Sequence, residues 1–361
     1  MMTMHGSRIA IYGATGYIGE LTARIAVERD LEPVLIGRGK RHVEEVARRL
    51  GLPWRIGALD DPEALDEALR DVSVVLNAAG PFSTTAGPLL DACIRTRTHY
   101  LDLSGEAVDF EAVRERHAEL IEADVMAMPG GGFGVVPTDA IAVHLSRVLP
   151  GAKSLELSFQ TVGGVSRGTA TTLVAGLPTA GWQRRGGALV PARGAEQRRT
   201  IPDGMGGHLT VATNPWRADV VSAAESTGIS DISTFTAMPG PVTALARIAP
   251  KVPWLFTSRP TRSALAALIR RLPPGPSEQQ LAAGRTVVHG RATALDGSVA
   301  EAVLIGPEAY LFTAHAAAEL LARTGAGAAV PGYRTPAQVH GPDLALTVPG
   351  TSLRDLARRA S

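Results

Sequence analysis

Several residue types are scarce in this 361-residue chain, and each shortage excludes a class of structure. The single cysteine, Cys93, rules out an intramolecular disulfide and indicates a reducing compartment. Aromatic residues make up only 4% of the chain, so the core must consist mainly of Ala, Val and Leu. No apolar run is long enough to cross a bilayer, and the N-terminus lacks the apolar core of a signal peptide. We therefore expect a cytoplasmic protein without a membrane span.

The net charge of the chain is also small, at +1. The chain has 36 basic and 35 acidic residues, which argues against a nucleic-acid-binding protein with a broad basic face. No His, Cys or acidic residues have the spacing of metal ligands, so the sequence predicts no metal site. The length exceeds that of most single domains and favours two.

The first third of the chain alternates short apolar strands with helical segments, the pattern of a doubly wound parallel sheet. We predict a dinucleotide-binding Rossmann domain over residues 1–135. Its six expected strands are Arg8–Tyr12, Pro33–Gly37, Trp54–Ile56, Val72–Asn77, Thr98–Leu103 and Val125–Met128.

After Gly134 the pattern changes and predicts a second, α+β domain over residues 136–330, built on a mostly antiparallel sheet. We expect the tail, 331–361, to return to the Rossmann domain, and the arginine-rich segment Arg184–Thr200 to be an exposed excursion. The strands expected in this sheet are Leu155–Val162, Leu209–Ala212, Arg285–Ala294 and Val299–Ile305.

A glycine-rich loop follows the first strand and opens a helix. In Gly13-Ala14-Thr15-Gly16-Tyr17-Ile18-Gly19, one glycine makes a tight turn, one lets the backbone approach a pyrophosphate, and one lets helix pack on strand. The pyrophosphate then faces the free N–H groups and the positive end of the helix. Because the flanking strand and helix agree with this motif, it predicts dinucleotide binding.

The end of the second strand indicates which dinucleotide binds. NAD-specific sites commonly place an acidic residue here, whereas this chain has Arg38 and, two residues on, Lys40. A guanidinium suits a 2′-phosphate, so we predict NADP(H), with an ordinary surface arginine as the alternative reading. The Tyr/Lys pair of short-chain dehydrogenases is excluded, since no tyrosine precedes a lysine by four residues.

Several segments resemble the saccharopine dehydrogenase-like oxidoreductases, including the trans-acting enoyl reductase group. The resemblance is carried by Tyr12–Gly19, Val75–Ser83, Thr98–Glu106, Pro129–Phe133, Val135–Asp139, Pro274–Glu278 and Thr313-Ala314. It implies a Rossmann domain, a second domain that carries the substrate and frequently forms a dimer, and nicotinamide chemistry on a C=N or C=C bond.

The carboxyl ends of the later strands are expected to surround the nicotinamide. Ala79, Gly80, Pro81 and Phe82 end the fourth strand, and Phe82 is either a wall for the ring or a plain turn residue. Asp102, Ser104 and Glu106 end the fifth strand and are the catalytic candidates, with helix capping as the alternative for Glu106.

Four further features complete the predicted site. Gly132 and Phe133 lie in a glycine-rich loop after the sixth strand, which lets backbone approach the cofactor or substrate closely. Arg167 could hold an anionic substrate group, or be solvated. Asp139 lines the cleft or favours the start of a helix. His208 and His315 are other candidates for proton transfer, with structural roles as the alternative.

The sequence thus predicts an NADPH-dependent oxidoreductase acting on a C=C or C=N bond of a small or carrier-bound substrate. A non-catalytic NADP(H)-binding scaffold or partner protein is the alternative. We see no obvious arginine pair for amino-acid carboxylates in the second domain, which argues against lysine metabolism.

Overall fold

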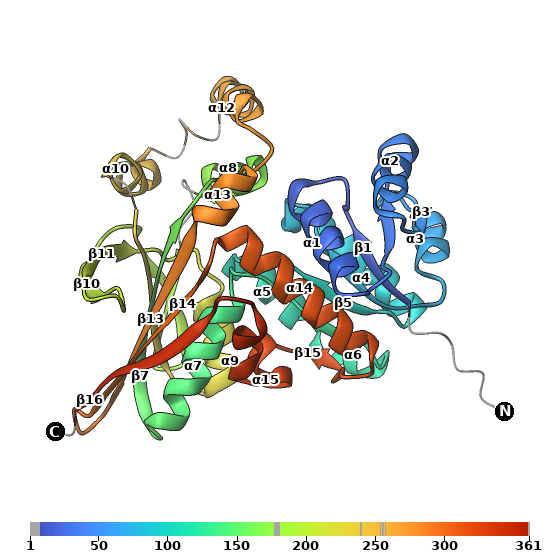
Figure 1. The fold of residues 1–361 in the computed structure, drawn as a ribbon. Coiled ribbons are helices and arrows are strands. Elements are labelled where there is room, and N and C mark those ends of the chain that lie inside the picture. Colours follow the sequence, from blue (N-terminus) through green and yellow to red (C-terminus); the bar gives the residue numbers. More distant parts are fainter. Residues whose placement is uncertain are drawn as a thin grey trace. The chain divides into compact units, whose positions relative to one another are not determined.

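The computed structural model describes residues 8–176, 181–238, 240–252, 254, 256 and 258–359. The chain divides into two compact units, each assembled from two segments of sequence (Figure 1). Unit 1 comprises Met1–Val136 and Tyr310–His340, and unit 2 comprises Pro137–Ala309 and Gly341–Ser361.

Unit 1 is built on a parallel sheet with the order β15-β6-β5-β4-β1-β2-β3. The strands are mostly apolar and buried, because helices cover a parallel sheet on both faces. They are β1 (Arg8–Tyr12), β2 (Val34–Gly37), β3 (Trp54–Ile56), β4 (Val72–Asn77), β5 (His99–Asp102), β6 (Met126–Met128) and β15 (Gly332–Tyr333).

Local sequence signals begin and end the helices of unit 1. Asp61 caps α3 by accepting a hydrogen bond from the Ala64 N–H at 3.0 Å, and Gly51 ends α2 in the left-handed conformation. The helices are α1 (Tyr17–Glu28), α2 (Lys40–Leu50), α3 (Pro62–Leu69), α4 (Phe82–Thr96), α5 (Ala107–Arg114), α6 (His117–Glu122), α14 (Ala309–Gly325) and α15 (Pro336–His340).

Unit 2 is built on a mixed sheet that is mostly antiparallel, with the main order β10-β11-β12-β7-β13-β14-β16. Only β7 and β12 pair in parallel. The strands are β7 (Ala152–Val162), β8 (Gly181–Arg185), β9 (Ala188–Ala192), β10 (Arg198–Pro202), β11 (His208–Thr213), β12 (Asp231–Thr236), β13 (Arg285–Ala294), β14 (Val299–Pro307) and β16 (Ser352–Arg359).

The helices of unit 2 leave part of this sheet uncovered. A Cβ on Gly290 of β13 would lie 2.2 Å from Cγ2 of Ile141, so α7 packs directly on one face. The helices are α7 (Val136–Val148), α8 (Arg167–Gly176), α9 (Asp219–Thr227), α10 (Gly240–Ile248), α12 (Arg259–Arg271) and α13 (Glu278–Ala283), with 3₁₀ turns η1 (Ala249–Lys251) and η2 (Pro342–Thr347).

The predicted fold class, a Rossmann domain followed by a second α+β domain, is confirmed, but the two units do not follow the predicted ranges. Helix α14 belongs to unit 1, where Glu319 forms ion pairs with Arg29, the residue after α1, and with Arg323. The tail is divided: β15 joins the parallel sheet, whereas β16 pairs with β14 in unit 2. Pairing between strands far apart in the sequence depends on the tertiary fold, so the local sequence could not indicate it.

Most residues of Arg184–Thr200 are exposed as predicted, but the prediction that the segment is an excursion is wrong. Strands β8 and β9 form an antiparallel hairpin, and β10 pairs with β11, so most of this segment belongs to the second sheet. Its arginines are compatible with strand structure because alternate residues of a strand point to opposite faces, one of which is open.

Candidate functional site

The glycine loop between β1 and α1 has the geometry of a dinucleotide site. Gly13 has φ +83°, and a Cβ there would lie 2.8 Å from the backbone N of Ala79. A Cβ on Gly19 would lie 2.4 Å from the carbonyl oxygen of Gly13. Both positions therefore exclude a side chain, one through backbone conformation and both through close approach.

The first turn of α1 is placed to receive an anion. Gly16 is the N-cap and contributes no capping side chain, and the N–H groups of a helix's first turn lack intrahelical acceptors. Thr15 and Gly16 are exposed, while Tyr17 and Ile18 are half-buried. The Tyr17 ring meets that of Tyr310 edge-on at 5.5 Å, so α14 closes one side of the loop.

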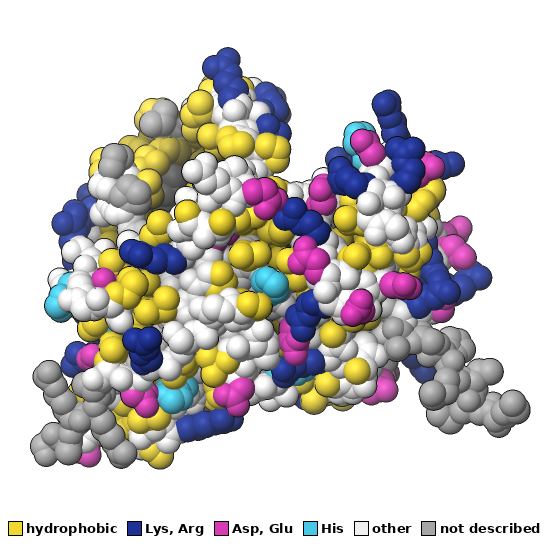
Figure 2. All heavy atoms as spheres, in the orientation of Figure 1, with side chains coloured by type: hydrophobic (Ala, Val, Ile, Leu, Met, Phe, Trp, Pro, Cys, Tyr) yellow, Lys and Arg dark blue, Asp and Glu magenta, His cyan; other side chains and the backbone are white. Residues whose placement is uncertain are grey.

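The end of β2 presents unpaired positive charge. Arg38 and Lys40 are exposed, and neither has an ion pair among the described residues. Arg38 lowers the pKa of Tyr12, although burial of that phenol raises the pKa more. Helix α2 begins at Lys40, its N-cap residue Gly39 offers no capping side chain, and its first turn has no acid. Basic side chains gather over this helix (Figure 2).

The loop after β4 is held by a buried asparagine. The Asn77 side chain accepts a hydrogen bond from the Ala79 N–H at 3.0 Å and donates to Thr85 Oγ1 at 3.1 Å. Gly80 and Pro81 follow, and Phe82, half-buried, begins α4. Because β1 and β4 are adjacent while β2 and β5 continue outward, this loop and the Gly13 loop flank the point where the strand order reverses.

Asp102 and Ser104 differ from the prediction that they face a cleft: both are fully buried. Asp102 Oδ1 accepts hydrogen bonds from the N–H and hydroxyl of Ser104, at 2.9 and 2.6 Å, and from the Gly130 N–H at 3.0 Å. Its Oδ2 accepts from the Tyr100 hydroxyl at 2.9 Å. Burial raises the pKa of Asp102, and these hydrogen bonds oppose the rise. Asp102 therefore organises the loops after β5 and β6.

Glu106 stands apart from that network. It is half-buried at the N-cap position of α5, yet it makes no capping bond, and its Oε2 accepts from the Gly105 N–H at 3.0 Å. Asp109 lies one turn into the helix, near enough for the Glu106 charge to act on its carboxyl. Burial, together with the charges of Glu106 and Asp102, raises the pKa of Asp109 to about 7. The Asp109 carboxyl therefore gains and loses its proton near neutral pH.

The glycine-rich loop after β6 is packed against protein. Gly130 has φ +76°, and the Gly131 N–H donates to the Asp102 carbonyl at 2.6 Å. A Cβ on Gly132 would lie 2.6 Å from Thr313 Cγ2, and the Phe133 N–H donates to Thr313 Oγ1 at 3.0 Å. The close approach expected of this loop is thus accounted for by β5 and α14.

The two predicted substrate residues have structural partners in unit 2. The Arg167 Nε donates to the Leu272 carbonyl at 2.6 Å, which ties the start of α8 to the end of α12. Asp139 is fully buried in the first turn of α7, and its Oδ1 accepts from the Ser226 hydroxyl of α9 at 2.5 Å. Asp139 therefore joins two helices of unit 2, a role that was not predicted for it.

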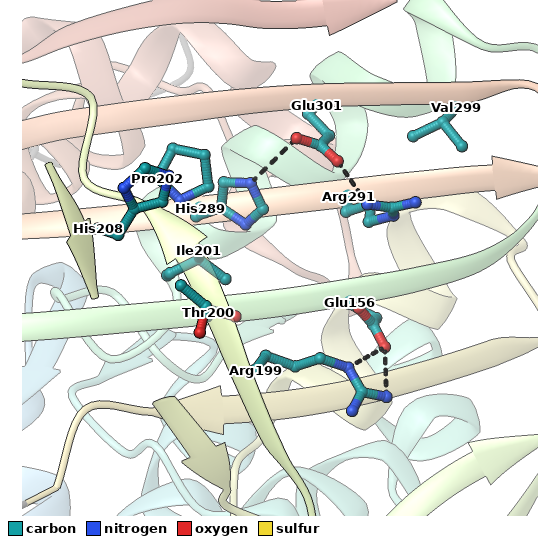
Figure 3. Close-up of a pocket in the computed structure, with 11 residues that line it drawn as sticks. Glu156, Arg199, Thr200, Ile201, Pro202, His208, His289, Arg291, Val299 and Glu301 are labelled. Atoms are coloured by element: carbon teal, nitrogen blue, oxygen red, sulfur yellow. Dashed lines mark hydrogen bonds and ion pairs between the residues drawn. The ribbon is translucent and has the colours of Figure 1, made fainter. Parts of the chain in front are cut away.

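A second candidate site lies on the face of the unit 2 sheet that α7 does not cover (Figure 3). It is a cavity of about 290 Å³, roofed by β10 and floored by β7, β13 and β14. Two ion pairs line the cavity. Arg199 of the roof pairs with Glu156 of the floor at 3.3 Å, and Arg291 pairs with Glu301 on the neighbouring floor strand at 2.7 Å. The remaining lining residues are Ser158, Thr200, Ile201, Pro202, His208, His289 and Val299.

His289 is the least exposed titratable group of this cavity. Its Nε2 has no hydrogen-bond partner among the described residues and lies 3.8 Å from Glu301 Oε2. Burial lowers the pKa of His289, and the Glu301 carboxylate partly restores it. The described residues contain no group of three or more His, Cys, Asp or Glu placed to hold a metal ion.

Three features of these sites were not predicted from the sequence. The Asp109 partner of Glu106 could have been found, since acids three residues apart lie together on a helix. The arginines of the second sheet were thought to lack a pair, but β10 and β13 bring Arg199 and Arg291 to one cavity. The place of Tyr310 and Thr313 beside the glycine loops depends on α14 and has no local signature.

Unit 1 thus combines a glycine turn, an open helix N-terminus and a switch in strand order, which define a dinucleotide-binding domain. Residues 9–128 match the family model of the saccharopine dehydrogenase NADP-binding domain, which identifies NADP as its cofactor and confirms the resemblance described above.

Curated relatives agree with this family. The chain is 29% identical to a trans-acting enoyl reductase of Mycobacterium ulcerans, over 38% of this chain and 35% of that protein. It is 26% identical to the saccharopine dehydrogenase-like oxidoreductase of Bos taurus, over 43% of this chain and 41% of that protein. The chain thus matches less than half the length of these relatives.

One solved structure covers both units. Apo saccharopine dehydrogenase (L-Glu forming) from Saccharomyces cerevisiae aligns with a TM-score of 0.64 over 98% of this chain and 100% of that one. At 13% identity, this similarity shows the fold alone.

Proposed function

We propose that the protein is an NADPH-dependent oxidoreductase that reduces a C=C or C=N bond of a small or carrier-bound substrate. The observation that carries the proposal is the Gly13–Gly19 loop, which excludes side chains where a pyrophosphate would approach, in a domain of an NADP-binding family. NADPH would supply the hydride, and the protein would bind and orient both reactants.

A preference for NADPH over NADH is supported by the start of α2. Basic side chains at a helix N-terminus oppose the helix dipole unless an anion lies among them. Arg38 and Lys40 flank this N-terminus and have no acidic partner among the described residues. The 2′-phosphate of NADPH would supply that negative charge, and a guanidinium can bind it through two hydrogen bonds.

The proton that accompanies hydride transfer needs a source. In our proposal it is the carboxyl of Asp109, because a pKa of about 7 lets this group hold and release a proton near neutral pH. Asp109, which is buried, would supply the proton, and Glu106, which is half-buried, would help to orient it. The ring of Phe82 and the strand ends at Ala79 and Gly80 would border the nicotinamide.

The names of the relatives favour an enoyl group or an imine of the saccharopine type as the reducible bond. A cytoplasmic homodimer joined through unit 2 is the assembly that we expect.

The test of cofactor choice is a side-by-side calorimetric titration of NADPH and NADH with wild type and Arg38→Ala. The wild type should prefer NADPH, and the variant should lose about 10- to 100-fold in NADPH affinity, since charge-assisted hydrogen bonds contribute ~1.5–3 kcal/mol. NADH affinity should stay the same. Arg48→Ala, at the other end of α2, is the matched control. Equal affinity of wild type for both cofactors would overturn the assignment.

A non-catalytic NADP(H)-binding scaffold remains the second candidate, and one observation favours it. Asp102 and Ser104, predicted to be catalytic, have their hydrogen-bonding capacity taken up within unit 1. A scaffold would bind NADPH but oxidise none of it when offered a panel of enoyl thioesters and cyclic imines. Oxidation of NADPH with any member of the panel would exclude the scaffold.

A further inference from the structure

The helices α8, α10 and α12 of unit 2 expose an unusual amount of apolar surface. Trp254 is 69% exposed, Leu268 of α12 is 61% exposed, and Ile248 of α10 is 55% exposed. Figure 1 shows these helices beyond one end of the second sheet, and Figure 2 shows hydrophobic and basic side chains together over α12. The other exposed apolar residues are Leu173, Val242, Leu245 and Leu272. We call this set of seven side chains the apolar surface.

The same part of the chain is strongly cationic. Between Asp231 and Glu278 there is no acidic residue, while the sequence holds six basic ones, at positions 247, 251, 259, 262, 270 and 271. Lys251, Arg259, Arg270 and Arg271 are exposed, and none has an ion pair among the described residues. In a chain whose net charge is +1, this is a marked local excess.

We propose that the apolar surface and its arginines bind an anionic lipid bilayer, with unit 2 attached peripherally. Exposed apolar side chains ringed by basic ones are the pattern of interfacial helices, which bury the apolar groups among acyl chains and hold lipid phosphates with the bases. Tryptophan favours this boundary because its ring is apolar and its N–H is polar. Attachment is peripheral, because no helix within the described residues has the length and apolarity needed to span a bilayer.

Charge and shape together favour a bilayer over other occupants. A second copy of this chain would bring like charges together if it used the same surface. An acidic protein would neutralise the positive charge of this surface. However, its most exposed apolar side chains are not gathered in one place, because they lie on α10, on α12 and at Trp254 between these helices. A fluid bilayer accepts such a distributed set without needing complementary pockets.

The experiment is sedimentation of the full chain with phosphatidylglycerol/phosphatidylcholine vesicles and with pure phosphatidylcholine vesicles, together with tryptophan emission. The protein should sediment with the anionic vesicles only, and its emission should shift to shorter wavelength as Trp254 leaves water. Trp254→Phe should abolish the shift while retaining sedimentation. The combined change Arg270→Gln and Arg271→Gln should weaken binding about 30-fold, at about fivefold per arginine.

Matched controls separate this surface from general effects of charge and hydrophobicity. Arg193→Gln with Arg198→Gln removes two exposed arginines elsewhere in unit 2 and should bind as wild type does. Leu268→Asp should abolish binding, whereas Leu295→Asp, at a residue 86% exposed, should not. Protein that stays in the supernatant with every vesicle would overturn the proposal and leave an acidic protein as the occupant. Equal loss in the two arginine pairs would overturn it as well.

Discussion

The sheet of unit 1 is parallel and buried, and its candidate site lies at the ends of the strands. The sheet of unit 2 is mostly antiparallel, and its candidate site lies across one open face. In unit 1 the candidate site consists largely of backbone: glycines that admit no Cβ and loops tied to Asp102. In unit 2 the candidate site consists of alternating side chains, such as Arg291 and His289 on β13.

This difference explains where similarity to known proteins is found. A backbone site restricts sequence at many positions, because any side chain at Gly13 or Gly19 collides with main-chain atoms. A site of side chains on an open face can change residue by residue while its sheet stays the same. Accordingly, the family model matches residues 9–128 within unit 1, and the fold similarity that covers both units has only 13% identity.

The largest expected effect is the loss of cofactor binding when the backbone site is filled. Gly19→Ala places a methyl group where the Gly13 carbonyl oxygen lies 2.4 Å away, so the loop must shift. We expect NADPH affinity to fall about 100-fold, which corresponds to ~3 kcal/mol of strain and lost contacts. Calorimetric titration measures this loss. Gly87→Ala is the control, since no atom lies within 4 Å of that Cβ; similar affinity in both variants would contradict the packing argument.

A smaller effect should follow from removing the carboxylate that joins the strand ends. Asp102→Ala leaves the buried N–H groups of Ser104 and Gly130 without their acceptor, which should lower the free energy of unfolding by ~3 kcal/mol. Urea unfolding monitors the change. Asp66→Ala, which removes an exposed ion pair with Arg95, should cost less than ~1 kcal/mol. If the two variants are equally stable, Asp102 does not organise the loops.

The unit 1 fold and its glycine loop could be predicted from sequence because each depends on local patterns. Continuous apolar strands between helices indicate a parallel sheet, and Gly13–Gly19 follows the first of them. The Asp102 network could not be predicted, since it requires β5 and β6 to lie side by side so that the Gly130 N–H reaches the Asp102 carboxylate. The cavity of unit 2 requires β10 to approach β7, although Arg199 and Glu156 are 43 residues apart in sequence.

The pH dependence of stability tests the carboxyl pair of unit 1. The pKa of Asp109 is about 7 in the folded chain and its ordinary value is 3.8, so the folded state binds the proton more tightly. Its contribution to stability is therefore complete below pH ~4 and is lost as the pH rises through 7, at up to ~1.4 kcal/mol per pH unit. Asp109→Asn should remove this dependence in urea unfolding between pH 4 and 8. Glu111→Gln, on the same helix, should retain it.

The smallest expected effect is a change in the pKa of His289, the buried histidine of unit 2. Burial shifts this pKa in the direction opposite to that of Asp109 in unit 1. Burial raises the pKa of the Asp109 acid and lowers that of the His289 base, so it favours the neutral form of each group. Glu301 is the largest influence that opposes the change at His289, and Glu156 contributes less. Glu301→Gln should therefore lower the pKa of His289 further, as followed by NMR titration of its ring protons, and Glu156→Gln should lower it less. The stability change should stay near ~0.5 kcal/mol, since the Arg291–Glu301 pair is partly exposed. If both variants leave the pKa of His289 unchanged, water screens the charges of this cavity from one another. The open sheet face of unit 2 would then lack the strong electrostatic coupling that burial produces at the unit 1 carboxyl pair.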